Sequence, residues 1–345
     1  MIERPVEGVH YPGSLPEMRR WFASEATCAD YLDWLRWPDG FCCPWCAGVT
    51  EWMPQTAGHR CGDCGRRVTA TSGTVFHNTR TPLSVWFEAA WLMMTSKQGV
   101  SALELQRVTG LGSYQTAWAM LHKLRTTMSQ EGRDLLTGRV EVDEALYGGF
   151  SPGKRGRAPG GKILVAAAIE RHGRRLGRAR MRLLPSASAR DLAAFVQATL
   201  APGSVLVTDG WVAYPAVARA AHLAHEPHAV TGSAAAAHEL LPGVHRVFSL
   251  SKRVLEGTLQ DGVQVTHLQA YLDEFVFRFN RRTARERGLL FLRLLEGAVA
   301  SQPTRYRDLV AEPKPRNRPQ PPAVARTLPT GLTETPRDRP WRQAA

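Results

Sequence analysis

The segment RVEVDEALY, residues 139–147, decides the fold of this chain. Its apolar and acidic side chains alternate, so that Val140 and Val142 share one face and Glu141 and Asp143 the other, as in a β-strand. A continuous apolar run follows at residues 163–169, and residues 178–184 alternate again. We therefore expect three successive strands.

A helix and a fourth strand come next. Ser188 and Asp191 have the spacing of a helix N-terminus, and residues 204–208 form a short apolar strand. Further helices are expected near 244–255 and 267–281. Because only the helix crossover permits a parallel neighbour, this order predicts an α+β domain with a mixed sheet. The order resembles that of ribonuclease-H-like folds, and we place the domain at residues 133–290.

The rest of the chain divides by composition. We expect helices within residues 1–40, a cysteine-rich module at 41–76, and a helical segment at 77–132 that opens with a buried helix at 82–97. The Gly-, Pro- and Arg-rich stretch 148–162 predicts a mobile basic loop. The Pro- and Arg-rich tail, 303–345, predicts disorder.

Charge and hydropathy restrict the classes of function. The 345 residues include 44 Lys and Arg against 31 Asp and Glu, a net charge of +13, which favours a polyanionic partner. The sequence has neither a run of 18 apolar residues nor a signal-peptide pattern. We therefore expect a cytoplasmic protein that is associated with the nucleoid and has no membrane partner.

The cysteines predict a zinc ribbon. All six lie between residues 28 and 64, whereas a disulfide framework spreads through a small secreted domain. Two CxxC pairs are separated by 14 residues, and each tight turn can place two thiolates on one tetrahedral ion. The predicted ligands of a structural Zn²⁺ are Cys43, Cys46, Cys61 and Cys64. A redox pair or coincidental pairs are the alternative; Cys28 and Cys42 are expected to be ordinary buried thiols.

Two short helices, 101–109 and 114–129, flank a Gly-Leu-Gly turn. Ser101, with Glu104 three positions later, and Ser113 are expected to cap them. The pattern predicts a helix-turn-helix whose internal core is Leu103, Val108, Leu111, Ala117, Met120, Leu121 and Leu124. The residues left for a DNA major groove are Tyr114, Gln115, Thr116 and Lys123. A plain helical hairpin is the alternative.

Two aspartates are candidate catalytic residues. Asp143 occupies a central strand, and Asp209 follows the strand 204–208 at its C-terminal end, where sites in α/β sheets collect. Carboxylates on neighbouring strands can hold two divalent ions about 4 Å apart, which activate the attacking oxygen and stabilise the leaving one. Taken singly, each aspartate is equally well explained as an edge or turn residue.

In combination, several segments resemble the DDE-type transposases of small bacterial insertion sequences, in the group with an N-terminal zinc ribbon. The segments are CCPWC, CGDC, GTVFHNTRTPLSVWFEAAWLM, VEVDEALYGG, VTDGWVAY, VHRVFSLSKRVLEGT and HLQAYLDEFVFRFNRR, and the similarity spans roughly residues 15–285. The resemblance implies metal-dependent cleavage at terminal inverted repeats, followed by attack of the freed 3′-hydroxyl on target DNA.

The resemblance also implies the roles of single residues. The two acids of the family match Asp143 and Asp209, and the lysine of VHRVFSLSK matches Lys252. The third metal ligand lies seven residues before that lysine, at His245, where many relatives have an acid. Imidazole is a softer ligand than carboxylate and suits Mn²⁺ or Zn²⁺ better than Mg²⁺. The expected catalytic metals are two Mg²⁺ or Mn²⁺ ions. Lys252 and the adjacent Arg253 are expected to contact DNA phosphate, unless Lys252 is merely a solvated residue.

The expected partners are double-stranded DNA, both as terminal inverted repeats and as target, and further copies of the chain. Symmetric cutting of two ends favours at least a dimer. Two other interpretations remain open: a decayed or domesticated copy that only binds DNA, and a stand-alone nuclease.

Overall fold

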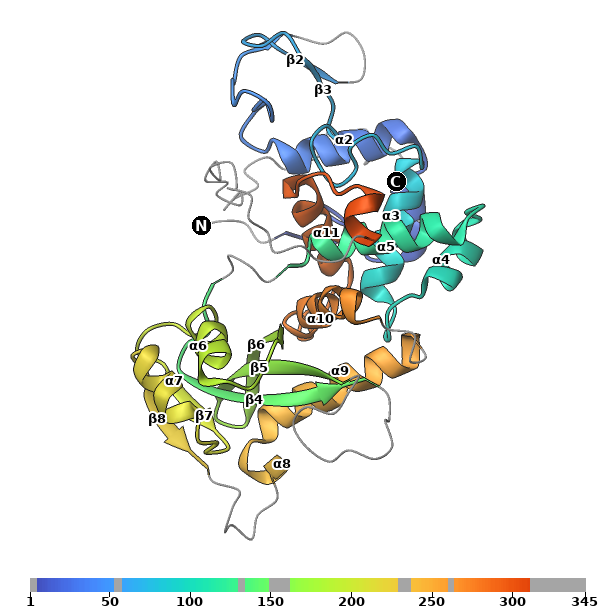
Figure 1. Ribbon diagram of the computed structural model, residues 1–345. Coiled ribbons are helices and arrows are strands. Elements are labelled where there is room, and N and C mark those ends of the chain that lie inside the picture. Colours follow the sequence, from blue (N-terminus) through green and yellow to red (C-terminus); the bar gives the residue numbers. More distant parts are fainter. Residues whose placement is uncertain are drawn as a thin grey trace. The chain divides into compact units, whose positions relative to one another are not determined.

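The computed structural model describes residues 5–52, 58–129, 134–148, 162–228, 237–259 and 264–310 (Figure 1). Most of the expected basic loop at 148–162, and the tail beyond residue 310, lie outside this part of the chain. Two compact units are distinguished by their internal contacts: Met1–Met128 with Ala284–Ala345, and Ser129–Thr283. The second unit is therefore inserted, in sequence, between two parts of the first.

The first unit combines a small sheet with a bundle of helices. Its sheet is antiparallel in the order β1-β2-β3, with strands β1 (Glu51–Trp52), β2 (His59–Cys61) and β3 (Arg67–Val68). Its helices are α1 (Leu15–Trp21), α2 (Glu25–Arg36), α3 (Leu83–Thr95), α4 (Ala102–Thr109), α5 (Tyr114–Thr126), α11 (Gly288–Ala300) and α12 (Tyr306–Val310). The tail that was expected to be disordered from residue 303 thus begins with a short helix.

Helix α3 is buried on nearly every side, as its apolar sequence predicts. Pro82 precedes it and offers no side-chain cap. The carboxylate of Glu25, at the start of α2, instead accepts hydrogen bonds from the backbone N–H groups of Leu83 and Ser84, at 3.0 and 3.3 Å. An acid from a distant part of the chain thereby satisfies donors that a helix N-terminus leaves open.

Helix α11 completes the aromatic core of the first unit although it follows the second unit in sequence. The Phe291 ring lies 5.8 Å from Phe87 and 5.5 Å from Trp91, centre to centre. At the start of this helix, a Cβ on Gly288 would lie 2.0 Å from the backbone oxygen of Pro12. Only glycine permits so close an approach, so the N-terminal segment and α11 are packed backbone to backbone.

The second unit is built on a five-stranded mixed sheet in the order β6-β5-β4-β7-β8. Its strands are β4 (Arg139–Tyr147), β5 (Ile163–His172), β6 (Arg175–Leu184), β7 (Val205–Thr208) and β8 (Ala224–Pro227). Strands β4, β5 and β6 pair antiparallel, while β7 is parallel to β4 and to β8. The parallel neighbour follows the first helix crossover, which confirms the predicted α+β class.

Helices cover both faces of this sheet (Figure 1). They are α6 (Ala189–Gln197), α7 (Tyr214–Ala220), α8 (Ala237–Leu240), α9 (Pro242–Leu259) and α10 (Val265–Phe279). Val140 and Val142 pack with α6 and α7, whereas α9 and α10 pack on the opposite face. The acidic face of β4 therefore lies toward α9.

Three elements of this unit, α7, β8 and the short helix α8, were not expected from the sequence. Strand β8 reads Ala-His-Glu-Pro, which lacks apolar alternation because the strand lies at the sheet edge. Helix α7 is rich in alanine and has no side-chain N-cap. Throughout the described segments, no helix is both long enough and apolar enough to cross a membrane.

Candidate functional site

The zinc-ribbon cysteines occupy two turns with the same backbone pattern. In the first turn the N–H of Ala47 donates to the carbonyl of Cys43, and in the second the N–H of Gly65 donates to the carbonyl of Cys61, both at 2.9 Å. The donor follows the second cysteine of each pair and has a positive φ, 59° at Ala47 and 67° at Gly65. These tight turns point both thiols of each pair to the same side.

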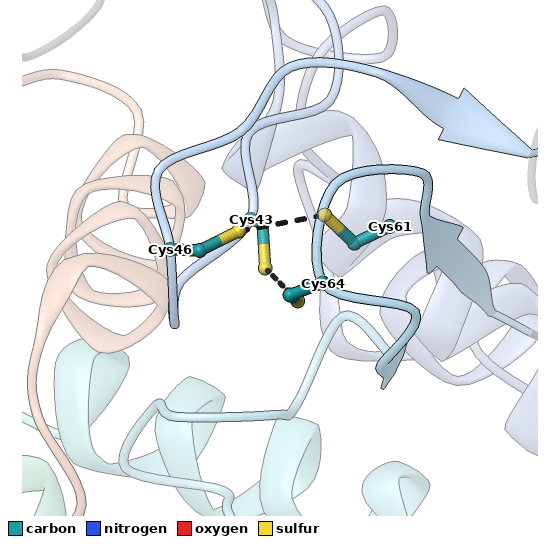
Figure 2. Close-up of side chains that lie close together, drawn as sticks. All are labelled: Cys43, Cys46, Cys61 and Cys64. Carbon is teal, nitrogen blue, oxygen red and sulfur yellow. Dashed lines mark hydrogen bonds between the residues drawn. The ribbon is translucent and has the colours of Figure 1, made fainter.

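The two turns bring all four thiols together (Figure 2). The Sγ atoms are 3.8 Å apart between Cys43 and Cys64, and 3.5 Å apart between Cys46 and Cys61. Zinc–sulfur bonds of about 2.3 Å in a tetrahedron set neighbouring sulfurs about 3.8 Å apart. The backbone N–H of Cys64 is the main group that lowers the pKa of the Cys61 thiol, to about 7. Geometry and donor chemistry both fit a zinc ion.

The other two cysteines are outside this set. Cys28 is fully buried, as expected, but Cys42 is only partly buried. The expectation of a buried thiol at Cys42 is wrong: it does not belong to the small ribbon core of Phe41, Cys43, Cys61 and Val68, and its Sγ lies 3.9 Å from the carbonyl oxygen of Ala47.

In the second unit, the sheet register brings the two candidate aspartates to neighbouring strands. Strands β4 and β7 pair in parallel with Glu141 opposite Val207. This is the last pair of the register: Asp143 lies two residues farther along β4, and Asp209 is the first residue after β7. Asp209 accepts the backbone N–H of Trp211 at 2.9 Å, so its carboxylate is held at the turn that ends β7.

Helix α9 brings a histidine to Asp143. The Nε2 atom of His245 lies 3.5 Å from Oδ2 of Asp143. Farther along α9, Lys252 and Arg253 line the same pocket as Asp143 and His245. Burial is the main factor that lowers the pKa of Lys252. The structure thus places the four predicted catalytic residues on β4, directly after β7 and on α9, and it brings two of them, Asp143 and His245, into contact.

The donor atoms of Asp143, Asp209 and His245 do not form a cluster compact enough for all three to bind one ion. In the described part of the chain, the four ribbon cysteines are the one group of three or more potential ligands whose donor atoms all lie within 4.8 Å of one another. Two ions about 4 Å apart require a wider set of donors. Two carboxylates and an imidazole fit divalent ions of the Mg²⁺ and Mn²⁺ kind.

Several residues around these positions escaped the sequence analysis. The Tyr214 hydroxyl donates to Glu144 Oε2 at 2.8 Å. Burial raises the pKa of Tyr214 most, and the charges of Glu144, Asp143 and Asp209 raise it further. A buried phenol therefore lies in the field of all three acids. Its only signal in the sequence is its place at the end of VTDGWVAY.

Tyr147 supports Lys252. The ammonium nitrogen of Lys252 lies 5.1 Å from the centre of the Tyr147 ring, within the range of a cation–π contact. The Tyr147 and Ser251 hydroxyls are hydrogen-bonded at 2.6 Å, which fixes the ring. The contact joins β4 to α9 near the candidate site.

Helices α4 and α5 differ from the expected helix pair in two details. Ser101 caps α4 by accepting the N–H of Glu104 at 3.1 Å, but Ser113 makes no side-chain cap. Leu103 and Val108 are 45% and 47% exposed, so their assignment to the internal core is wrong. Helix α4 buries the face that carries Ala102 and Leu105 instead. Leu103 and Val108 therefore lie on its exposed face.

The candidate DNA-reading residues lie at the start of α5. Gln115 is exposed, Tyr114 is 51% exposed, and Thr116 is partly exposed. Lys123 lies farther along α5, where burial lowers its pKa. The first three residues are accessible to a partner, whereas Lys123 is partly enclosed by its own unit.

Two families match the chain. The ISXO2-like transposase domain matches residues 135–280, and the transposase zinc-ribbon domain matches residues 23–67. The two regions are thus similar to a transposase domain and to a transposase zinc ribbon. All four ribbon cysteines fall in the zinc-ribbon match, and Asp143, Asp209, His245 and Lys252 fall in the transposase-domain match. Helices α4 and α5 lie between the two.

A curated relative points the same way. An uncharacterized protein in transposable element ISH50 of Halobacterium salinarum is 28% identical to this chain over 127 residues. The matched segment covers 36% of this chain and 42% of that protein. The chain therefore matches less than half of the relative's length.

Proposed function

We propose that this protein is a transposase, which binds the terminal inverted repeats of an insertion sequence and cuts and joins DNA strands at a two-metal site. The observation that carries the proposal is the approach of His245 on α9 to Asp143 on β4, at 3.5 Å, with Asp209 directly after the neighbouring parallel strand. The order of strands in the sheet, which is that of ribonuclease-H-like enzymes, supports the same assignment.

The residues have separate tasks in this proposal. Asp143, Asp209 and His245 would hold two divalent ions, which supply Lewis acidity to the attacking and leaving oxygens of a phosphodiester. Lys252, held against Tyr147, would bind a phosphate oxygen near the cut. In cleavage, water would attack phosphorus at the element's end and the bond from phosphorus to the 3′-oxygen would break, which frees a 3′-hydroxyl. In strand transfer, this 3′-hydroxyl would attack a target phosphorus, whose bond to its own 3′-oxygen breaks and leaves a 3′-hydroxyl on the target strand.

A strand-transfer assay tests the proposal directly. We expect the purified full chain, given Mg²⁺ or Mn²⁺, to join labelled DNA that carries the element's ends to a target plasmid. Binding without cutting would identify a decayed or domesticated DNA-binding protein. Cutting without joining would identify a nuclease. Either result contradicts the proposal, and a scrambled end sequence serves as the control.

The start of α5 is proposed as the DNA-reading end of a helix-turn-helix. The N-terminal residues of such a helix contact base edges in the major groove. We expect Gln115→Ala or Thr116→Ala to weaken binding to terminal-repeat DNA by about 1–3 kcal/mol if the lost side chain reads a base edge. Affinity is measured by titration at fixed salt, since phosphate contacts make it salt-dependent.

The matched control for these variants is Gln302→Ala, which removes an exposed glutamine outside α4 and α5. It should leave the affinity unchanged. Equal affinities for the wild type and both α5 variants would indicate that α4 and α5 are a plain helical hairpin and not a DNA-reading helix-turn-helix.

A further inference from the structure

Helix α9, which carries His245 and Lys252, begins without a cap of its own. Its first residue is Pro242, which has no backbone N–H, and the preceding residue, Leu241, is fully buried and apolar. The early N–H groups of a helix have no partner inside the helix and need an acceptor from elsewhere. A residue on the sheet supplies one.

That residue is Glu141 on β4. Its Oε2 accepts the backbone N–H of Val244 at 2.9 Å, and its Oε1 lies 3.2 Å from Nε of Arg171 on β5. Glu141 is 5% exposed, so both contacts are made away from water, where charged hydrogen bonds are strong. A carboxylate at a helix N-terminus is also favoured by the helix dipole.

The position of this contact matters because it is directly beside the candidate site. Glu141 and Asp143 are two residues apart on one face of β4, and Val244 and His245 are consecutive on α9. The hydrogen bond from Val244 to Glu141 and the approach of His245 to Asp143 are therefore neighbouring links between the same strand and the same helix turn.

Gly243 makes the close approach possible. A Cβ at this position would lie 2.8 Å from Oε2 of Glu141 and 3.0 Å from Cδ of Arg171. A larger residue would push the carboxylate away from the helix N-terminus. The sequence Pro-Gly-Val-His thus gives α9 an N-terminus that the carboxylate of Glu141, on strand β4, can reach.

We propose that Glu141 is a positioning residue, whose buried carboxylate holds the first turn of α9 and thereby sets the imidazole of His245 beside Asp143. The inference rests on the proposed function, in which His245 is a metal ligand. It assigns no metal contact to Glu141. Residues that orient a ligand in this way typically change metal affinity by about 10–100-fold when they are replaced.

The test uses Mn²⁺ bound to the full chain without DNA. Pulsed electron paramagnetic resonance detects the ¹⁴N coupling of an imidazole nitrogen bound to Mn²⁺, and a titration gives the affinity. We expect the coupling in the wild type and its loss in His245→Ala. In Glu141→Leu, which removes the acceptor, we expect the coupling to be lost and the Mn²⁺ affinity to fall about 10–100-fold. Glu141→Gln keeps an acceptor oxygen and should retain the coupling.

A second variant covers the case in which Glu141→Leu does not fold. Gly243→Ala displaces the carboxylate while alanine favours the helix by roughly 0.5–1 kcal/mol, so a loss of coupling there does not arise from a weaker helix. The matched control is Glu170→Gln, at a buried acid of β5 that pairs with Arg178 and accepts the N–H of Thr137. It should retain the coupling even if its melting temperature falls.

The outcomes separate the inference from the function on which it rests. A wild type without ¹⁴N coupling, or a coupling that survives in His245→Ala, would refute His245 as a ligand and with it the proposed metal set. A coupling and affinity that stay at the wild-type level in folded Gly243→Ala, while His245→Ala loses them, would overturn the role of Glu141 alone.

Discussion

Asp143→Asn and Asp209→Asn are each expected to abolish cleavage and joining of element-end DNA while leaving the affinity for that DNA intact. Asparagine keeps the shape of the side chain but removes the negative charge that attracts a divalent ion. The loss of rate should exceed the roughly 10–100-fold typical of residues that only orient a ligand. Binding should persist because the proposed recognition residues lie on α5.

Cleavage rates under Mg²⁺ and Mn²⁺, with DNA affinity measured in parallel, check this expectation. Asp134→Asn is the matched control, since Asp134 is an exposed aspartate of the same unit. It should cut at the wild-type rate. If Asp143→Asn or Asp209→Asn also cut at that rate, the corresponding aspartate would not be a metal ligand.

The second large effect is expected from Cys61→Ser. Zinc binding contributes about 10–16 kcal/mol to the folding of small zinc modules, and the hydrophobic core of the ribbon has four buried members among the residues that the structure describes. The variant should lose its zinc and the order of β1 to β3. Metal analysis should find one equivalent of zinc in the wild type and well below one in the variant. The second unit, which shares no residues with the ribbon, should still melt cooperatively.

Cys42→Ser provides the control for this experiment. Cys42 is adjacent to Cys43 in sequence but outside the set of four close thiols. We expect it to retain a full equivalent of zinc. Retention of zinc by Cys61→Ser, or loss of zinc by Cys42→Ser, would show that the ligand set is wrong.

Local patterns predicted most of the fold. The alternation in β4 and β6 and the apolar run of β5 are visible in the sequence because each strand has its own burial pattern. The four-cysteine cluster was predictable for a similar reason, since both turns are short and each fixes two thiols. Strand β8 was missed because an exposed edge strand needs no such pattern. The outward turn of Leu103 and Val108 depends on which face of α4 meets its neighbours, and the sequence of α4 alone does not determine this.

The candidate site was predictable only in part. Asp209 follows a recognisable strand, β7, which pairs in parallel with the strand that carries Asp143. His245 was selected by resemblance to a family, and its roles and those of both aspartates stay predictions. The Glu141 to Val244 contact joins residues 103 positions apart, and the Tyr214 to Glu144 contact joins residues 70 apart. No local sequence pattern predicts such pairs, because each of the two residues fits the pattern of its own strand or helix and gives no sign of a distant partner.

The return of α11 to the first unit has a consequence for shortened forms of the protein. Phe291 contacts Phe22 and Phe87 in one aromatic core, so that core lacks a member until translation has passed residue 291. A stop codon or frameshift anywhere within the inserted unit would leave Phe22, Phe87 and Trp91 uncovered. Such a truncated product would expose a large apolar surface and would be subject to aggregation or proteolysis. A broken copy of the gene would therefore not release a stable N-terminal fragment able to compete with the intact protein.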